Sequence, residues 1–351
     1  MKNSTLTDLL KMEIFDENGI QYPIKEGFPE DRISKSYRIN NALAFHVPIG
    51  ARNTMLFQLI ITERGTICIS NYIFPEKKTI ICRSPAAILE VYSTLGGKID
   101  IHLENDQIRS ANAGTYNVMA APSVFNRATF EGNILTVDFH PDPEYIAELA
   151  KTYPQLTKII NADRKGYIET LHKEEGNMPF LAAFLYVDLI RKIHEENINM
   201  QTRTELMHPI IALMVDPQGS TFTEIQLNYE KLMAVSHMVA YVKNNLELNY
   251  TVADLQKLST KFNALRYNEI LISFKAIYKK TPIAYIKELK MLAAKTYLDK
   301  GKRESTVASR LGYSYLSHLE RDFKAYHGIS IKEYKKATKD KDAINLHKRD
   351  H

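Results

Sequence analysis

The sequence predicts an α+β multidomain protein, with an antiparallel β barrel in its N-terminal part and an all-helical C-terminal part. Residues 36–140 consist of short β-rich stretches separated by turn residues. From Pro143 on, apolar residues recur at helical spacing. Charge is also unevenly distributed along the chain. From position 228 on, 24 lysines and arginines face 13 acidic residues, a net charge of +11, whereas the preceding part has 22 against 28, a net charge of −6.

Residues 1–160 are expected to form the β domain. β-branched and aromatic residues dominate the stretch from Asn53 to Phe74, with a turn at Arg64–Gly65. Further short strands follow up to His140, and Gly96–Gly97 is expected to form a tight hairpin. Strands of this length and spacing are typical of a small antiparallel barrel or sandwich.

Residues 161–215 are expected to form a helical region for packing or dimerisation. The helix that begins at Phe180 is apolar almost all round its first three turns. It therefore packs under the barrel or forms a subunit interface. A further helix is predicted from Glu205 to Val215, with Pro209 in its first turn. Residues 216–228 begin with turn-forming residues and are predicted to be a linker.

Composition argues against a membrane-bound or secreted protein. No apolar run approaches the ~20 residues that a membrane span requires. The first residues contain no sustained apolar core and no small-residue cleavage site. Cys68 and Cys82 are the only cysteines and are expected to be a reduced interior pair. We therefore expect a cytoplasmic protein.

The C-terminal part is organised around residues 305–334. The first helix of this stretch should end at Gly312, because glycine takes the left-handed conformation of a tight turn. Ser314 is expected to cap the second helix. Apolar residues three and four positions apart form the buried side of that helix: Leu316, Leu319 and Phe323. This layout, together with the basic charge, is typical of a DNA-reading helix-turn-helix.

An internal repeat indicates that this unit occurs twice within residues 229–340. Residues 274–285 echo residues 323–334 with an offset of 49 positions. An amphipathic helix is expected over Tyr229–Leu246, followed by a helix capped by Thr251 and a first recognition helix from about Leu265 to Tyr278. Thr281 and Pro282 should start a linker helix that ends near Leu298. Residues 341–351 are predicted to be a basic tail.

Residues 229–336 resemble the DNA-binding domain of AraC/XylS-type transcription regulators. The second unit follows the family pattern without a gap at Val307-Ala308, Gly312-Tyr313, Phe323-Lys324, His327-Gly328, Ser330 and Tyr334. The helix between the units matches at Lys290-Met291, Ala294 and Tyr297-Leu298. The resemblance implies promoter DNA as a partner and a cupin-like sensor barrel with a small-molecule effector. It also implies a homodimer, and contact with RNA polymerase if the protein is an activator.

The cupin-like barrel raises the question of a metal site. Cupin enzymes hold a metal with an H-x-H pair, a glutamate and a distant histidine. His46, His102 and His140 lie in the corresponding region, but none belongs to such a pair. We therefore expect no metal, no other cofactor and no catalytic residue. The barrel is expected to form a sensory or structural pocket instead.

The resemblance also implies which residues face DNA. The base-facing positions are Tyr267, Asn268, Leu271 and Ile272 in the first unit, and Leu316, Ser317, His318 and Arg321 in the second. Arg321 is expected to bind guanine through two hydrogen bonds, and Asn268 to bind adenine in the same way. Phosphate contacts are expected from Lys275, Lys324 and the helix starts at Thr251 and Ser305.

Departures from the family pattern leave alternatives open. Leu271 and Ile272 are apolar where polar residues are usual, Lys279 replaces a glycine and Ile331 replaces a proline. The first unit is therefore expected to contact thymine methyl groups or mainly the DNA backbone. One alternative function is a protein-interaction module that does not read DNA. A cupin enzyme fused to a helical domain is another. The lack of a histidine cluster, a phosphate-binding glycine loop and a nucleophile motif argues against it.

Overall fold

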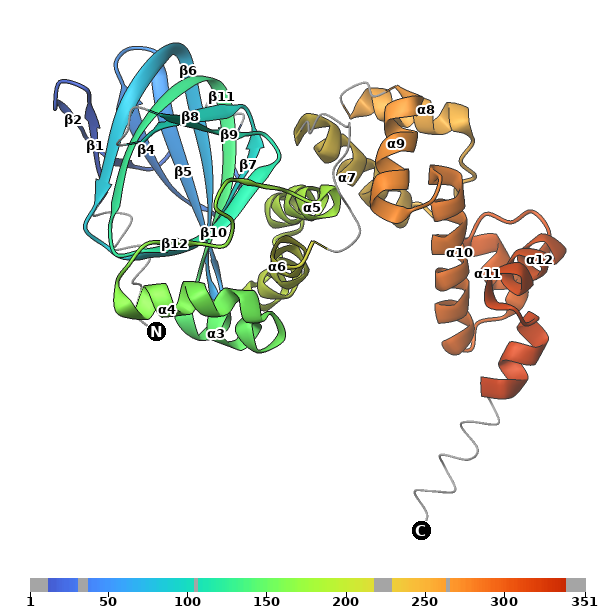
Figure 1. Cartoon of the computed structure of the whole chain (residues 1–351). Helices are drawn as coiled ribbons and strands as arrows, with labels where there is room; N and C mark the ends of the chain where they lie inside the picture. Colours follow the sequence, from blue (N-terminus) through green and yellow to red (C-terminus); the bar gives the residue numbers. More distant parts are fainter. Residues whose placement is uncertain (1–11, 31–36, 104–106, 218–228, 263–265, 339–351) are drawn as a thin grey trace. The chain divides into compact units, whose positions relative to one another are not determined.

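A computed structural model describes residues 12–30, 37–103, 107–217, 229–262 and 266–338. The chain divides into two compact units, Met1–Met233 and Ala234–His351, and each is described here by itself (Figure 1). Of the predicted linker, residues 218–228 lie outside the described residues. The predicted basic tail, 341–351, lies wholly outside them.

The described part of the N-terminal unit contains one 13-stranded sheet in which all neighbouring strands are antiparallel. This confirms the predicted β-rich N-terminal fold. Its strands are β1 (Glu13–Asp16), β2 (Gln21–Tyr22), β3 (Lys25–Glu26), β4 (Leu43–Ile49), β5 (Asn53–Thr62), β6 (Gly65–Ser84), β7 (Ile88–Gly96), β8 (Lys98–His102), β9 (Ile108–Asn112), β10 (Thr115–Ala121), β11 (Val124–Pro141), β12 (Glu169–Thr170) and β13 (Gly176–Asn177).

The two long strands β6 and β11 fold the sheet over on itself (Figure 1). Their pairing register shifts between Phe130 and Gly132, so that each strand contributes to two layers. In one layer they are flanked by β5 and β7, and in the other by β1 and β8. The core between the layers includes Ile14, Phe57 and Phe74, together with Phe130 itself. The result is a barrel-like unit built from one antiparallel sheet.

The turn at Arg64–Gly65 is confirmed, but the hairpin at Gly96–Gly97 is wrong. β7 pairs with β10 and β11, whereas β8 pairs with β9 and a different part of β11. The chain therefore passes from one layer to the other at Gly97 instead of reversing on itself. Gly97 has a φ of 74°, and an added Cβ would lie 2.7 Å from the carbonyl oxygen of Asn133.

Helices follow the sheet, as Pro143 and the apolar spacing predict: α3 (Pro143–Thr152), η1 (Pro154–Leu156), α4 (Thr157–Lys165), α5 (Phe180–Glu196) and α6 (Met200–Val215). Most apolar side chains of α5 are buried, and α6 packs beside it. α6 starts five residues earlier than predicted, because Asn199 accepts a hydrogen bond of 2.8 Å from the Thr202 N–H. Pro209 consequently lies inside the helix and not in its first turn.

The C-terminal helices occur where the sequence predicts them: α7 (Tyr229–Asn244), α8 (Val252–Lys261), α9 (Tyr267–Tyr278), α10 (Pro282–Asp299), α11 (Glu304–Arg310) and α12 (Leu316–His327), with residues 331–338 also helical. α10 packs against α9, α11 and α12. The core around its second half includes Met291, Leu311, Leu319 and Phe323. Across the described ranges, no helix is both long and apolar enough to cross a membrane.

Candidate nucleic-acid interface

The predicted repeat is confirmed by matching contacts in the two halves of the C-terminal unit. The rings of Phe274 and Tyr285 meet at 5.7 Å and 66°, and those of Phe323 and Tyr334 at 5.6 Å and 62°. The Thr281 hydroxyl accepts from the Ala284 N–H at 3.3 Å, and the equivalent Ser330 hydroxyl accepts from the Glu333 N–H at 3.2 Å. Both units therefore use the same aromatic contact and the same cap at the start of the next helix.

α12 separates a buried side from a polar exposed side. Leu319 and Phe323 are fully buried. The predicted contact residues Ser317, His318, Arg321 and Lys324 are all exposed on the other side. Leu316 is half-buried and packs against the core, so the structure gives it a structural role beside the predicted base contact. Arg321 keeps 70% of its side chain exposed, and its Nε lies 3.5 Å from Asp322 Oδ1.

Asp322 fixes the orientation of α12. Its Oδ1 lies 2.9 Å from the Lys287 ammonium of α10, and its Oδ2 accepts a hydrogen bond of 3.2 Å from the Tyr313 hydroxyl. Burial opposes ionisation of this carboxyl group, but the hydrogen bonds and charge of Lys287 outweigh it and hold its pKa below the usual value. α12 is thereby tied to both α10 and the preceding turn.

The turn of the second unit depends on Gly312. Its φ is 72°, and an added Cβ would lie 1.9 Å from the carbonyl oxygen of Glu247. The Gly312 carbonyl accepts a hydrogen bond of 2.8 Å from Asn249, whose side-chain oxygen accepts one of 3.1 Å from Lys290. This link between the turn, the 245–249 loop and α10 was not predicted. The only signal for this link in the sequence was Lys290, a lysine in an otherwise apolar helical stripe.

The first unit places its predicted residues on α9. Ile270 and Phe274 are buried, as predicted. Asn268, Ile272 and Lys275 are exposed, whereas Tyr267 and Leu271 are half-buried. Ile272 keeps 45% of its surface exposed, so the exposed face of α9 presents an apolar side chain. Part of the preceding turn, residues 263–265, lies outside the described residues.

The predicted helix starts are partly correct. Thr251 caps α8, and its hydroxyl accepts a hydrogen bond of 3.2 Å from the Asp254 N–H. α11, however, begins at Glu304 with Arg303 at the N-cap, so Ser305 is not the start of the helix. Ser305 still lies in the first turn, where N–H groups have no partner within the helix. Ser314 does not cap α12 either, since Tyr315 occupies the N-cap without a side-chain hydrogen bond.

The three histidines of the N-terminal unit have separate environments. His46 Nδ1 lies 2.8 Å from the Gly27 carbonyl, and His102 Nε2 lies 2.7 Å from the Thr129 hydroxyl. Burial lowers the pKa of His140 to about 4. No group of three or more possible metal ligands occurs in the part of the chain that the structure describes. Cys68 and Cys82 are free thiols, and burial raises the pKa of Cys82 to about 12.

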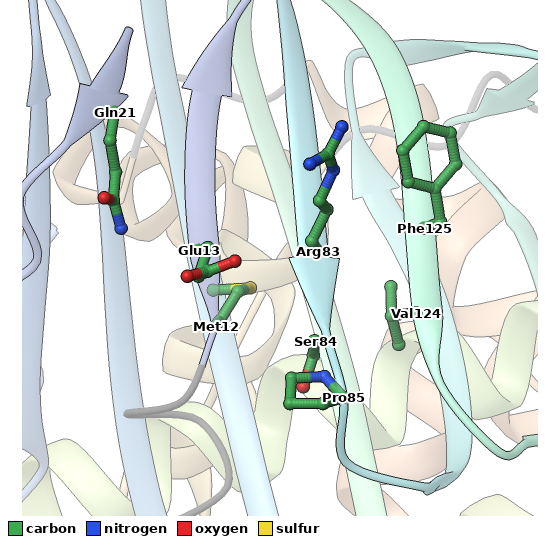
Figure 2. A pocket seen from close by; sticks show the side chains of 8 residues that line it. All are labelled: Met12, Glu13, Gln21, Arg83, Ser84, Pro85, Val124 and Phe125. Carbon is green, nitrogen blue, oxygen red and sulfur yellow. The ribbon is translucent and has the colours of Figure 1, made fainter. Parts of the chain in front are cut away.

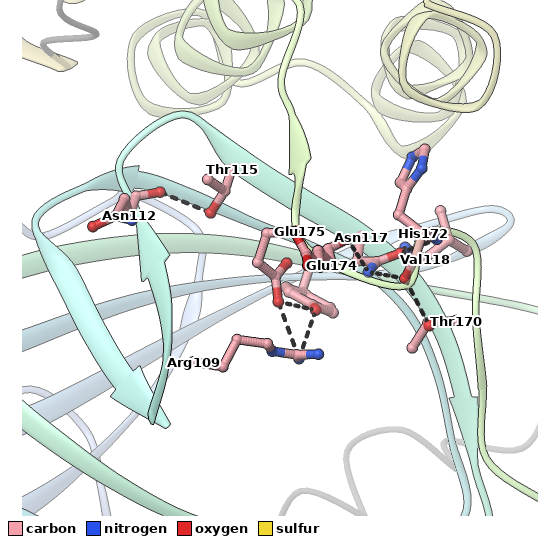
Figure 3. A network of polar contacts seen from close by, with 10 residues as sticks. Arg109, Asn112, Thr115, Asn117, Val118, Thr170, His172, Glu174 and Glu175 are labelled. Carbon is pink, nitrogen blue, oxygen red and sulfur yellow. Dashed lines mark hydrogen bonds and ion pairs between the residues drawn. The ribbon is translucent and has the colours of Figure 1, made fainter. Parts of the chain in front are cut away.

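A polar network that the sequence analysis missed lies beside β10 (Figure 3). The Arg109 guanidinium of β9 meets the Glu175 carboxylate at 3.0 Å, and the Tyr92 hydroxyl of β7 donates to the same carboxylate at 2.8 Å. Asn117 of β10 holds the segment that carries Glu175, because its side chain accepts from the His172 N–H and donates to the His172 carbonyl. The sequence offered one signal for this network, namely charged residues at positions expected to lie in strands.

An open hollow of ≈ 620 Å³ lies over β1, β6 and β11 (Figure 2). The Arg83 guanidinium lies 5.3 Å from the Phe15 ring and 5.4 Å from the Phe125 ring, within the range of cation–π contacts. Phe125 is 62% exposed. Nothing in the sequence analysis pointed to this surface.

Residues 269–337 match the family model described as a helix-turn-helix domain. A comparison with curated proteins found no match.

Three solved structures illustrate the likeness. A probable AraC family transcriptional regulator from Rhodopseudomonas palustris is 22% identical, with 30% of this chain and 96% of that chain covered and a TM-score of 0.26. The AraC-like transcriptional activator CuxR is 14% identical, with 78% and 94% covered and a TM-score of 0.32. ToxT from Vibrio cholerae is 12% identical, with 77% and 96% covered and a TM-score of 0.28.

Proposed function

We propose that this chain, which carries a helix-turn-helix domain of the AraC type at its C-terminus, is a sequence-specific DNA-binding transcription regulator. The observation that carries the proposal is the duplicated scaffold: α9 and α12 each bury one side and expose the other. Recognition helices that enter successive major grooves on one face of DNA lie ~34 Å apart, one helical turn. The rigid helix α10 between the two units suits such a fixed spacing.

Arg321 is the proposed guanine reader, because its guanidinium is exposed and its neighbour Asp322 is already occupied by Lys287 and Tyr313. Asn268 is the proposed adenine reader of the first unit. Lys275 and Lys324, with the first turns of α8 and α11, are proposed to contact phosphates. Leu271 and Ile272 suit contact with thymine methyl groups.

The test is selection of binding sites from random-sequence DNA at fixed salt, with wild type, Arg321→Ala and the exposed control Lys300→Ala. We expect two enriched blocks one helical turn apart, of which Arg321→Ala loses one and Lys300→Ala loses none. One block in wild type would mean that the first unit only positions the protein. Binding without enrichment that merely weakens with salt would contradict the proposal.

The N-terminal unit is proposed to be a cupin-like sensor for a small-molecule effector, without catalytic activity. A ligand would act by changing the relative stability of two domain or dimer arrangements. The proposed setting is the cytoplasm, with a homodimer formed through the helical region and RNA polymerase as a partner if the protein activates. Light scattering at several concentrations, with and without operator DNA, tests the dimer. A monomer under all conditions would contradict that part.

A second candidate function is a protein-interaction module, favoured by the exposed Ile272 on α9. Ile272→Gln separates the two functions. If α9 contacts thymine methyl groups, this variant changes the base preference in one block of the selected sites. If α9 binds a protein, the variant leaves the selected sites unchanged.

A further inference from the structure

The hollow of ≈ 620 Å³ lies on the outer face of the sheet, where β2, β1, β6 and β11 are successive neighbours (Figure 2). The strand register places Glu13 of β1 opposite Arg83 of β6, and Arg83 opposite Phe125 of β11. Directly opposite residues share a face of a sheet, so these three side chains stand in one row. The adjacent Ile14 and Cys82 pack into the core instead. The row therefore belongs to the outer face.

Arg83 is held by aromatic rings and not by a carboxylate. Its guanidinium carbon lies 5.3 Å from the centre of the Phe15 ring and 5.4 Å from the centre of the Phe125 ring. No ion pair or side-chain hydrogen bond joins Arg83 to any residue that the structure describes. Cation–π contact with a ring leaves the N–H donors at the edge of the guanidinium available. Such donors suit a carboxylate, which arginine binds through two parallel hydrogen bonds.

Glu13 supplies the opposite charge without neutralising Arg83. Opposite charges at directly paired strand positions attract each other. Among the described residues, however, Glu13 forms no ion pair, and the guanidinium contacts the two rings instead. Figure 2 shows Glu13 on one side of Arg83 and Phe125 on the other. The remaining lining residues are neutral, so the hollow contains one unpaired group of each sign and a net charge of zero.

This charge pattern selects against ligands of a single charge. An anion bound to Arg83 would meet the carboxylate of Glu13, and a cation bound to Glu13 would meet the guanidinium. A zwitterion satisfies both groups. The Gln21 amide and the Ser84 hydroxyl also line the hollow. The Ser84 oxygen accepts a hydrogen bond of 3.3 Å from the Ala86 N–H, which leaves its O–H free to donate.

The hollow also offers an apolar wall formed by Phe125, Val124, Met12 and Pro85. Phe125 keeps 62% of its surface exposed. An exposed apolar surface rimmed by polar groups marks a binding surface, and a ligand side chain that covers it removes apolar area from water. The volume lies within the range of roughly 300–1,000 Å³ that is usual for small-molecule sites.

From these features we infer that this hollow binds a zwitterionic α-amino acid with an apolar side chain. Arg83 holds the carboxylate of the amino acid, Glu13 its ammonium group and Phe125 its side chain. The inference gives the proposed effector a chemical class, and it therefore rests on the proposed sensory function.

Three probes with one phenyl ring and different charge test the inference on the full-length chain: phenylalanine, phenethylammonium, which lacks the carboxylate, and hydrocinnamate, which lacks the ammonium group. Binding is followed by NMR of methionine methyl groups, and Met12→Leu identifies the Met12 signal. We expect phenylalanine to shift this signal saturably. Each singly charged probe should bind about 10-fold more weakly or worse, because it loses a charge-assisted hydrogen bond. Equal binding of phenylalanine and either singly charged probe, or no saturable shift with phenylalanine, would overturn the inference.

Variants identify the two charged groups by opposite effects. Arg83→Gln should weaken binding of phenylalanine and strengthen that of phenethylammonium. Glu13→Gln should weaken binding of phenylalanine and strengthen that of hydrocinnamate, since each variant removes one repulsion. Arg52→Gln and Glu76→Gln, which break an exposed ion pair elsewhere on the sheet, are the controls and should bind as wild type does. Unchanged phenylalanine binding in either Arg83→Gln or Glu13→Gln would also overturn the inference.

Thermal unfolding checks that each variant folds, which is expected because Glu13 and Arg83 are exposed. DNA binding is measured separately for each variant, without probe. Variants that select DNA normally but bind phenylalanine weakly would support the inference. Failure of the DNA selection would contradict the proposed function and leave the Met12 signal as a readout, so that the two proposals fail independently.

Discussion

Helices α9 and α12 share one scaffold but expose side chains of different chemistry. With the offset of 49 residues, the buried Ile270 and Phe274 of α9 correspond to Leu319 and Phe323 of α12. The exposed Ile272 corresponds to Arg321. Core positions have thus kept their apolar character, while the equivalent surface position carries a methyl-rich side chain in one unit and a guanidinium in the other.

The two helices also differ in how they are anchored. Asp322 of α12 binds Lys287 and Tyr313, whereas the equivalent Ser273 of α9 carries no charge. α12 ends at Gly328 with a φ of 78°, whereas α9 ends at Lys279 with a φ of 56° in the same left-handed region. The comparison teaches that the fold needs the buried stripe and the terminal backbone conformation, and tolerates changes in the anchor and in the exposed face.

The largest effect is expected at Gly312, in the turn of the second unit. Gly312→Ala should destabilise the C-terminal unit by at least about 3 kcal/mol, because left-handed strain and a clash with the Glu247 carbonyl add together. The control Gly328→Ala meets no neighbouring atom within 4 Å and should lose only the strain part. Thermal unfolding of both variants measures the difference. Equal losses would mean that the contact with Glu247 is not important.

Arg321→Ala should weaken binding to the selected DNA by ~1–3 kcal/mol and remove base discrimination in one block. Ile272→Ala should have a smaller effect, confined to the other block, because it loses apolar contact without a hydrogen bond. Competition binding with block-specific base substitutions measures both. A larger loss for Ile272→Ala would reverse the assignment of the stronger reader.

Asp322→Asn should destabilise α12 by about 1–2 kcal/mol, since Lys287 loses its buried partner. The folded-state pKa of Asp322 is lowered, so its contribution is present above the pKa of the unfolded state. It is lost as the pH falls through the lower folded value. Acid should therefore loosen α12 before α9, as followed by hydrogen exchange corrected for intrinsic rates. Glu320→Gln, an exposed neighbour, is the control. Loss of both helices at one pH would contradict this prediction.

The smallest effect is expected at the end of α9. Lys279→Gly should stabilise the protein by about 0.5–1 kcal/mol, because glycine adopts the left-handed conformation without strain. Lys279→Ala keeps the strain and should give no gain. Denaturant unfolding distinguishes the two. If both variants behave alike, the positive φ at Lys279 is not a source of strain.

Local sequence patterns determined most of the C-terminal unit. The stripe of Leu319 and Phe323, the caps at Thr251 and Thr281 and the 49-residue repeat follow from contacts between residues close in the chain. The antiparallel β-rich character of the N-terminal unit was likewise predictable from strand-forming residues and turns.

Tertiary structure decided what depends on contacts between distant residues. Gly96–Gly97 looked like a hairpin, but the pairing of β8 with β11 determines its conformation. The Glu247 carbonyl makes Gly312 indispensable beyond its role in the turn. Arg109, Tyr92 and Glu175 come from two separate strands and a connecting segment. Strand order and register, which single-residue preferences do not specify, bring them into one polar network.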